Sequence, residues 1–256
     1  MSGVLPGNLS AVSTCVVYVD GLGEPRTCDL LDLPALAVEG WRPVRDFYAW
    51  PGQRTFQGWW WSRTTRTLLA FESLLERQAL MSFDFDPFVS DMSVQPFAFV
   101  WPRSEASPRY HVPDLFLRNS DGTGAVVDVR AAGLLDERAR AQFDLTAGTC
   151  AEIGWDYAVY EELQTPRLQN LQFLSGYRQD RQAPVPAVAD AVRAAFRSPA
   201  RLDNGARDAS LLAGCPLAGA TSACFHLLWT HDLHVDLDNE LTSASTLVAG
   251  HVTAPR

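Results

Sequence analysis

The chain has 256 residues, of which 47% are hydrophobic, and its formal net charge is −9 at pH 7. This length and composition are enough to bury a substantial core, which excludes a largely disordered protein and allows one large domain or two small ones. No apolar run approaches the roughly 20 residues needed to cross a bilayer, and the start lacks the basic and apolar segments of a secretory signal, so we expect a cytoplasmic protein that does not contact the membrane.

The cysteines and basic residues further restrict the class of protein and the partners that it can bind. The five cysteines are widely spaced and never paired as CxxC, so we expect reduced thiols rather than a disulfide framework or a zinc site. The acidic net charge argues against a generally DNA-binding surface, but residues 41–77 contain more arginines than acids. Because phosphate binding needs local positive potential, we expect Arg54, Arg63 and Arg66 of this segment to contact a DNA backbone.

The first part of the chain predicts a short β-rich lead-in, residues 1–40, with a strand over Thr14–Asp20 and a second apolar stretch over Cys28–Leu33. A run of three tryptophans, residues 59–61, then leads to a helix expected over Leu69–Ser82. The tryptophans suit packing better than base stacking. Glu72 and Glu76 are four residues apart and share one face of that helix.

The middle of the chain predicts three strands, then a helix, then a last strand. These elements are expected over Met92–Trp101, Tyr110–Arg118, Gly124–Arg130, Leu135–Gly154 and Trp155–Glu161. The simplest packing for this order is a mixed sheet flanked by helices, which is an α/β (α+β) fold.

The pattern changes beyond Pro166, where several short helices are followed by a possible two-stranded wing. These elements are expected over Leu168–Tyr177, Val185–Phe196, Ala206–Gly214, Thr221–Trp229 and, for the wing, Leu233–Val248. That order predicts a small winged-helix-like domain over residues 166–256. His226, His231 and His234 match no metal-site spacing and are expected on its surface. Its acidic balance, with Asp232, Asp236 and Asp238 close together, favours protein rather than DNA as its partner.

Two short motifs in the middle segment contain candidate metal-binding and catalytic residues. Asp114 follows Pro113, and Asp128 and Arg130 come two apart at the end of a predicted strand, so their side chains point to the same face. Carboxylates are the ligands that hard divalent cations prefer, and such cations polarise phosphoryl oxygens. Taken alone, the pattern is short, and a strand-end cap with a surface ion pair explains it as well.

The sequence around these motifs resembles the endonuclease subunits of TnsA-type transposases over about residues 54–162. The blocks that carry the resemblance are F71ESLLERQALMSFDFDPFVSDMSVQPFAF99, Y110HVPDLFLRNSDG, V126VDVRA, A141QF and C150AEIGWDY157. The resemblance implies a restriction-endonuclease-like core over residues 41–165 and dependence on Mg²⁺, with Mn²⁺ as a substitute. It also implies DNA cleavage at transposon ends, a DDE-type partner transposase and an AAA+ ATPase regulator.

By the same resemblance, Glu76, Asp114 and Asp128 take the places of the metal ligands, and Arg130 takes that of the remaining catalytic residue. Glu72 and Gln95 are possible accessory residues. The family generally has lysine where this chain has Arg130, and an arginine cannot lose its proton. Two functions therefore stay open: an active endonuclease subunit, or a catalytically inactive subunit that keeps the nuclease fold for assembly or DNA docking.

Overall fold

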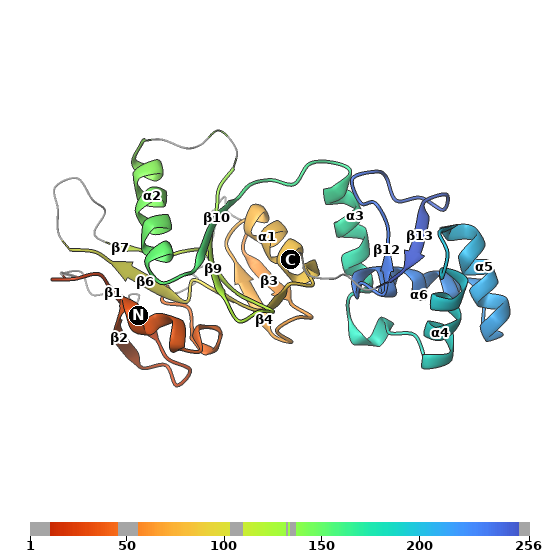
Figure 1. The fold of residues 1–256 in the computed structure, drawn as a ribbon, viewed down its shortest axis with the longest axis horizontal. Coiled ribbons are helices and arrows are strands. Elements are labelled where there is room, and N and C mark those ends of the chain that lie inside the picture. The colour runs from red at the N-terminus through yellow and green to blue at the C-terminus, as the bar shows by residue number, and fades with distance from the viewer. Residues whose placement is uncertain (1–10, 46–55, 103–109, 132, 134–136, 251–256) are drawn as a thin grey trace. The chain divides into compact units, whose positions relative to one another are not determined.

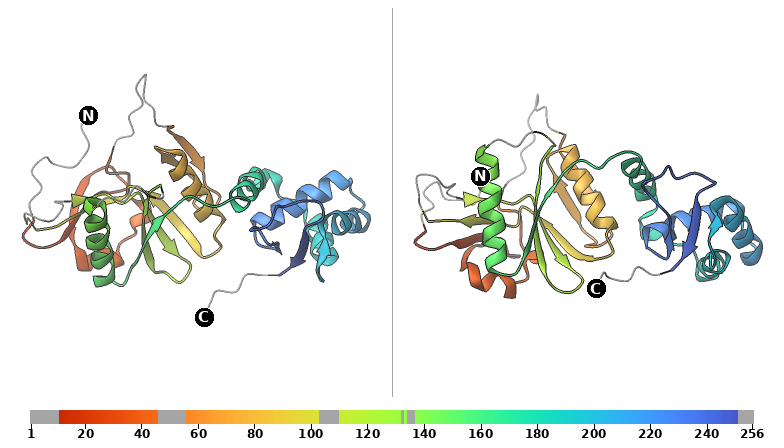
Figure 2. Two further views of the ribbon diagram at one scale, coloured as in Figure 1. Left: turned by 90° about the horizontal axis from the view of Figure 1, so that it is seen from above. Right: turned by 45° about the horizontal axis from the view of Figure 1, so that its top comes forward.

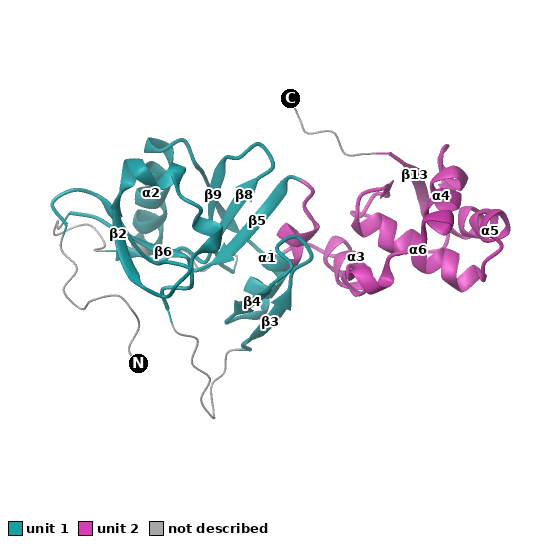
Figure 3. Ribbon diagram, turned by 90° about the horizontal axis from the view of Figure 1, so that it is seen from below, with its two compact units in different colours: residues 1–80, 88–162 teal, residues 81–87, 163–256 magenta. Residues whose placement is uncertain are grey.

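The structure is a computed structural model that describes residues 11–45, 56–102, 110–131, 133 and 137–250 (Figure 1). Two compact units divide the chain: residues 1–80 with 88–162, and residues 81–87 with 163–256 (Figure 3). The described part has a mixed α+β architecture, as the order of its elements predicted.

The N-terminal strands of unit 1 belong to a four-stranded sheet in the order β2-β1-β6-β7. Strand β1 (Cys15–Val19) pairs antiparallel with β2 (Pro25–Asp29) on one side and with β6 (Phe97–Val100) on the other. Strand β7 (Tyr110–His111) completes the sheet, and two short 3₁₀ helices, Leu30–Ala35 and Val38–Gly40, follow β2. The lead-in is therefore joined to the middle of the chain through pairing between residues about 80 positions apart, as Cys15 opposite Val100 shows.

A second four-stranded sheet has the order β10-β9-β8-β5 and carries most of the predicted site residues. Its strands are β5 (Val89–Val94), β8 (Leu115–Asn119), β9 (Gly124–Val129) and β10 (Asp156–Tyr160). Strands β8 and β9 pair antiparallel with Leu115 opposite Val127, whereas β10 runs parallel to β9 with Val159 opposite Asp128. The sheet is therefore mixed, as predicted, and Asp114 and Asp128 fall at neighbouring strand ends.

Two predicted strands are each divided by a proline. The expected strand Met92–Trp101 is split at Gln95-Pro96 into β5 and β6, which belong to different sheets. The expected strand Tyr110–Arg118 is split in the same way at Pro113 into β7 and β8. A proline lacks the N–H that a continuous strand would use, so the chain turns from one sheet to the other at both places.

The helix expected over Leu69–Ser82 begins later and ends later, as α1 (Leu74–Phe85). Residues Leu68–Phe71 form strand β4 instead, which pairs antiparallel with β3 (Gly58–Trp61) in a two-stranded hairpin. Along β3 the side chain of Trp60 is 4% exposed and that of Trp59 is 64% exposed. The tryptophan run is therefore divided between core and surface, because side chains alternate along a strand.

Helix α2 (Glu137–Glu152) connects β9 to β10, and α1 and α2 lie on opposite sides of the β10-β9-β8-β5 sheet (Figures 1 and 2). The core on the α2 side contains large buried side chains from both four-stranded sheets, including Phe97, Phe116, Val126 and Trp155. Phe97 contacts Phe116 and Trp155 at ring-centroid distances of 6.5 and 6.3 Å. This packing explains why the two sheets form one unit.

Unit 2 consists mainly of short helices and a small three-stranded sheet. Its helices are α3 (Arg167–Leu174), α4 (Pro186–Ala195), α5 (Leu202–Ala213) and α6 (Leu217–Trp229), with short 3₁₀ helices at Ser175–Tyr177 and Asp180–Gln182. Its sheet has the order β11-β13-β12, formed by Ala200–Arg201, Thr246–Ala249 and Leu233–His234. Gly205 of α5 packs so closely on Phe196 that an added Cβ would lie 2.2 Å from the ring.

No single helix in the described ranges combines the length and the hydropathy of a membrane span, although α5 and α6, bent by 115°, satisfy both criteria as a pair.

Candidate functional site

Glu76 lies in the first turn of α1, where its carboxylate is held by the start of the helix. Its Oε1 accepts a hydrogen bond from Ser73 Oγ at 3.0 Å and its Oε2 accepts one from Glu72 N at 2.8 Å. Ser73 Oγ in turn accepts from Glu76 N at 3.1 Å. The bond from Glu76 N to Ser73 Oγ is one half of a capping box, whereas the Glu76 carboxylate binds the N–H of Glu72, one residue before the capping serine. Burial raises the pKa of Glu76, and the nearby charge of Glu72 adds to the increase.

Gln95 connects the start of α1 to the strand that carries Asp114. Its Nε2 donates to Glu72 Oε2 at 3.2 Å, and its backbone N–H donates to Asp114 O at 3.0 Å. The side chain is 3% exposed, and its Oε1 is buried without a hydrogen-bond partner among the described residues. Its backbone has φ +44°, a conformation that costs on the order of 1 kcal/mol for a residue with a Cβ. Strain and an unpaired acceptor thus coincide at one residue.

Asp114 lies between the other two predicted carboxylates. Its Oδ2 accepts a hydrogen bond from Val129 N at 2.7 Å. Burial raises the pKa of this carboxyl to about 7, and the charges of Asp128 and Glu76 act in the same direction, whereas the hydrogen bond from Val129 opposes the shift. Asp114 therefore lies close enough to each of the other two predicted carboxylates to be affected by its charge. Among the described residues, however, no three His, Cys, Asp or Glu side chains are arranged as ligands of a single metal ion.

Asp128 is 2% exposed, and both of its oxygens are engaged. His111 Nε2 lies 2.9 Å from Oδ1 and 2.9 Å from Oδ2, and Tyr157 OH donates to Oδ2 at 2.6 Å. The other ring nitrogen of His111 pairs with Gln142 Nε2 at 2.5 Å. An amide N–H can only donate, so Nδ1 accepts from Gln142 and Nε2–H donates to Asp128. The result is a chain of hydrogen bonds from α2 to the end of β9.

His111, Tyr157 and Gln142 were not predicted as members of this cluster. All three lie inside the blocks that carry the family resemblance, but their meeting depends on pairing that a single sequence does not show. His111 comes from the other four-stranded sheet, and Tyr157 faces Asp128 because β10 runs parallel to β9 with Tyr157 opposite Val126. Strand alternation within the GWDY157 block was the available signal for Tyr157.

Replacing Tyr157 by phenylalanine is expected to lower the free energy of unfolding by about 1.5–3 kcal/mol, because the buried Asp128 carboxylate would lose a short hydrogen bond. Burial and the charge of Asp128 both raise the pKa of Tyr157, so its hydroxyl keeps the proton to donate. Urea unfolding at pH 7 measures the change. Tyr110→Phe, at an exposed tyrosine, is the control and should change stability by less than about 0.5 kcal/mol. Equal effects of the two variants would contradict this account of Asp128.

Arg130 follows β9, and its backbone N–H donates to Tyr160 O at 3.0 Å. The side chain is exposed, and its guanidinium carbon lies 6.0 Å from the centre of the Phe143 ring on α2. Phe143 also contacts Tyr157, at a ring-centroid distance of 6.2 Å. Arg130 therefore lies on the α2 side of the sheet, where Tyr157 binds Asp128, and its charged end remains accessible to an anion.

The arginines predicted to contact DNA differ in accessibility. Arg66 is exposed at the turn of the β3–β4 hairpin, with φ +55°. Arg63, near the end of β3, is half-buried. Arg54 lies outside the described residues.

The histidines of unit 2 form no metal site in the described part of the chain. Each pairs with a backbone carbonyl oxygen instead: His226 with Tyr177, His231 with Phe85 and His234 with Gly250. The prediction that all three lie on the surface is wrong for His226, which is 3% exposed because it packs on the inner face of α6.

The clustered acids of unit 2 are partly engaged within the unit. Asp232 forms an ion pair with Arg193 at 3.0 Å, and Asp238 forms one with Arg167 at 3.2 Å. Asp236 accepts hydrogen bonds from Asp238 N and Asn239 Nδ2. These acids therefore stabilise local structure as well as contributing negative charge to the surface.

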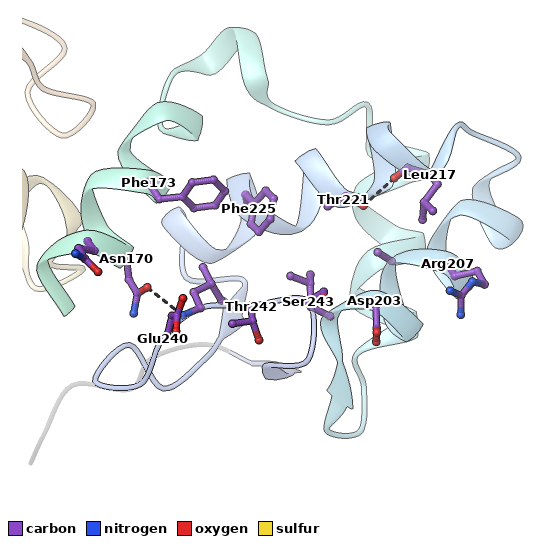
Figure 4. A pocket seen from close by; sticks show the side chains of 14 residues that line it. Asn170, Phe173, Asp203, Arg207, Leu217, Thr221, Phe225, Glu240, Thr242 and Ser243 are labelled. Carbon is purple, nitrogen blue, oxygen red and sulfur yellow. Dashed lines mark hydrogen bonds between the residues drawn. The ribbon is translucent and has the colours of Figure 1, made fainter. Parts of the chain in front are cut away.

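Unit 2 also has a pocket of about 450 Å³ between α3, α5, α6 and the segment before β13 (Figure 4). Phe173 and Phe225 meet edge to face on one side of it, with ring centroids 4.8 Å apart. The side-chain amide of Asn170 is engaged in hydrogen bonds within the unit. Its nitrogen donates to the carbonyl oxygens of Leu237 and Asn239, and its oxygen accepts from Leu241 N. The pocket contains none of the predicted catalytic residues.

In comparisons with known proteins, no protein-family model matches the chain, and no curated protein sequence matches it.

Proposed function

We propose that this chain is the metal-dependent DNA endonuclease subunit of a TnsA/TnsB-type transposase, which hydrolyses a phosphodiester bond at transposon ends. The observation that carries the proposal is the burial of Asp114, just before β8, within the electrostatic influence of Asp128 on β9 and of Glu76 at the start of α1. Among the described residues, no arginine forms an ion pair with Glu76, Asp114 or Asp128. Buried carboxylates that are close to one another and have no arginine partner favour the binding of a cation.

The donor atoms suit a hard divalent cation such as Mg²⁺ or Mn²⁺. Carboxylate and amide oxygens are the ligands that such ions prefer, and the Oε1 of Gln95 is a buried oxygen without a hydrogen-bond donor. The Gln95 amide cannot be turned to remove this deficit, because Glu72 needs a donor and the nitrogen must face it. The residues that would hold the ion are Glu76, Asp114 and Asp128, with the Gln95 carbonyl as a further ligand.

The roles of the other residues follow from their contacts. A bound divalent ion polarises a phosphoryl oxygen and lowers the pKa of water. His111 and Tyr157 hold the Asp128 carboxylate in one orientation and keep its charge hydrogen-bonded. Arg130, exposed beside this cluster, would bind the scissile phosphate and stabilise the charge that develops on it.

The architecture supports the same proposal at the level of the fold. The mixed sheet β10-β9-β8-β5, flanked by α1 and α2, agrees with a restriction-endonuclease-like core. Helices α4 to α6 followed by β12 and β13 agree with a winged-helix-like domain. The proposed partners are transposon-end DNA, a DDE-type transposase subunit and an AAA+ ATPase regulator.

Two observations favour the alternative, a catalytically inactive subunit that keeps the nuclease fold for assembly or DNA docking. Both Asp128 oxygens already accept hydrogen bonds, and arginine stands where the family has lysine. The two candidates are distinguished by cleavage of transposon-end DNA in the presence of the partner transposase, with and without Mg²⁺ or Mn²⁺.

The proposed cation site predicts that the chain binds Mn²⁺ without DNA and that Gln95 contributes to the affinity. Replacing Gln95 by methionine, which has a similar shape but no amide oxygen, should weaken binding by about 10- to 100-fold. Asp114→Asn should weaken it at least as much. Calorimetric titration with Mn²⁺ gives the affinity, and Gln169→Met in unit 2 is the control. Equal affinity of wild type and Gln95→Met would remove Gln95 from the site, and no binding by wild type would contradict the site itself.

A further inference from the structure

A groove of about 560 Å³ lies on unit 1 between residues 41–45, the β3–β4 hairpin and the edge strand β5. The side chains that define its chemistry are Trp41, Arg42, Arg45, Trp59 and Ser93. Clefts of roughly 300–1,000 Å³ accommodate ligands the size of a nucleotide. A DNA duplex is too wide to enter such a space.

Trp59 offers the groove an accessible aromatic face. It is 64% exposed although the neighbouring Trp60 is 4% exposed, because alternation along β3 turns Trp59 outward. The other tryptophan of the groove, Trp41, is already stacked on Tyr18, with ring centroids 3.7 Å apart and an interplanar angle of 11°. Trp59 is thus the ring on which a planar ligand can stack.

Two arginines make one side of the groove positive. Arg42 and Arg45 are both exposed, and Arg42 forms no ion pair with a carboxylate in the described ranges, since its Nε donates to Gly21 O. Of the two acids that line the groove, only Glu39 is paired with a cation in the described ranges. Glu39 forms an ion pair with Arg118 at 3.2 Å, and Asp91 Oδ1 accepts a hydrogen bond from Met92 N at 2.8 Å. An anionic ligand would therefore meet accessible guanidinium groups.

Ser93 supplies an independent indication of a ligand. It lines the groove and is 5% exposed, and its Oγ is buried without a hydrogen-bond partner among the described residues. A buried hydroxyl left unpaired destabilises a protein, so this Oγ would gain from a hydrogen bond to a water molecule or to a bound ligand.

The groove continues toward the candidate cation site. Val94 lines the groove, and the next residue, Gln95, contacts Glu72 and the backbone of Asp114. Arg45 acts electrostatically on Glu76, because its positive charge lowers the pKa of that carboxyl. A polymer bound in the groove would therefore lie close to Gln95 and Glu76.

We propose that this groove binds an unpaired DNA strand next to the cleavage site, with a base stacked on Trp59, phosphates bound by Arg42 and Arg45, and a hydrogen bond to Ser93 Oγ. Stacking needs an exposed base face, which a duplex does not present at this depth, and aromatic platforms with nearby cations are the usual means of binding single strands. The inference rests on the proposed endonuclease function, because it assigns the substrate strand to that site.

Binding of a fluorescein-labelled oligothymidine, followed by anisotropy in EDTA so that no cleavage occurs, tests the groove. Trp59→Ala should weaken binding by about tenfold or more, whereas Trp59→Phe should retain most of the affinity. Trp61→Ala is the matched control, since Trp61 is on the same strand, 39% exposed, and does not line the groove. DNA should also quench tryptophan emission in wild type, and this quenching should be smaller in Trp59→Phe.

The arginines are tested by the salt dependence of the same binding. The double variant Arg42→Gln and Arg45→Gln should reduce the slope of log affinity against log salt by about 1.4, which corresponds to two phosphates of a single strand. Arg197→Gln, at an exposed arginine of unit 2, should leave the slope unchanged.

The outcomes distinguish a failure of the groove proposal from a failure of the proposed endonuclease function. If Trp59→Ala and the double arginine variant bind the strand as wild type does, the groove is rejected even if the protein cleaves DNA. If duplex DNA binds more tightly and quenches Trp59 equally, the unpaired strand is the wrong ligand. If the predicted pattern is found but wild type never cleaves with a divalent metal, the groove stands and the endonuclease function fails.

Discussion

Replacing Arg130 by alanine is expected to reduce Mg²⁺-dependent nicking, measured with the partner transposase, by about 10²- to 10³-fold. The reason is that Arg130 is the exposed basic side chain beside the Asp128 cluster, where it can stabilise charge on a phosphate. Arg130→Lys should retain or raise the activity, because it restores the residue that the resembled family has. Gel analysis of end-labelled transposon-end DNA measures the rates.

The control for this experiment is Arg140→Ala. Arg140 is also exposed but lies on α2, and this variant should nick DNA like wild type. If wild type is inactive while Arg130→Lys cleaves, the chain is a lapsed nuclease and the assembly function is the better description. If neither protein cleaves although both bind DNA and partner, the catalytic assignment of Glu76, Asp114 and Asp128 is wrong.

The stability of the metal-free protein is expected to fall with rising pH because of Asp114. Its folded-state pKa of about 7 lies well above the ordinary value of 3.8, so the folded protein holds a proton that the unfolded chain releases. The stabilisation is complete below about pH 4 and is lost as the pH rises through 7. A difference of about three between the two pKa values corresponds to at most about 4 kcal/mol.

Urea unfolding in EDTA between pH 5 and pH 8 measures this effect. The free energy of unfolding of Asp114→Asn should vary less with pH than that of wild type, since an amide does not titrate. At pH 8 the variant should be the more stable of the two. Asp156→Asn, at an exposed position on β10, is the control and should follow wild type. Mg²⁺ should restore part of the wild-type stability at pH 8, because a cation compensates the repulsion. Parallel pH profiles of wild type and Asp114→Asn would contradict the proposed environment of Asp114.

The sequence indicated the order of the elements well but not where two strands end. Residues 97–100 are all buried, so with Met92 and Val94 they read as one continuous apolar strand. Pro96 was the available signal for the break, but the change of sheet also depends on φ +44° at Gln95, which the sequence does not indicate. Leu69, Ala70 and Phe71 suited a helix equally well, and only their pairing with β3 makes them a strand. These misses share one cause, since long-range pairing overrides local preference.

Only part of the candidate site could be predicted from the sequence. Strand alternation and the family motifs indicated the carboxylates, because such signals are local. His111 could not be assigned, because it reaches Asp128 from a strand of a different sheet. The hydrogen bond from Glu76 N to Ser73 Oγ was implicit in the spacing of the two residues, but this segment was interpreted only as part of the family resemblance.

Cleavage of transposon-end DNA by the wild-type chain together with its partner transposase tests the central claim most directly. The account predicts nicking that requires Mg²⁺ or Mn²⁺, stops in EDTA and is abolished in Asp114→Asn, while DNA and partner binding persist in that variant. Absence of cleavage by wild type with either metal, when it binds both DNA and partner, or equal cleavage by Asp114→Asn, would contradict the claim that these carboxylates form a nuclease site.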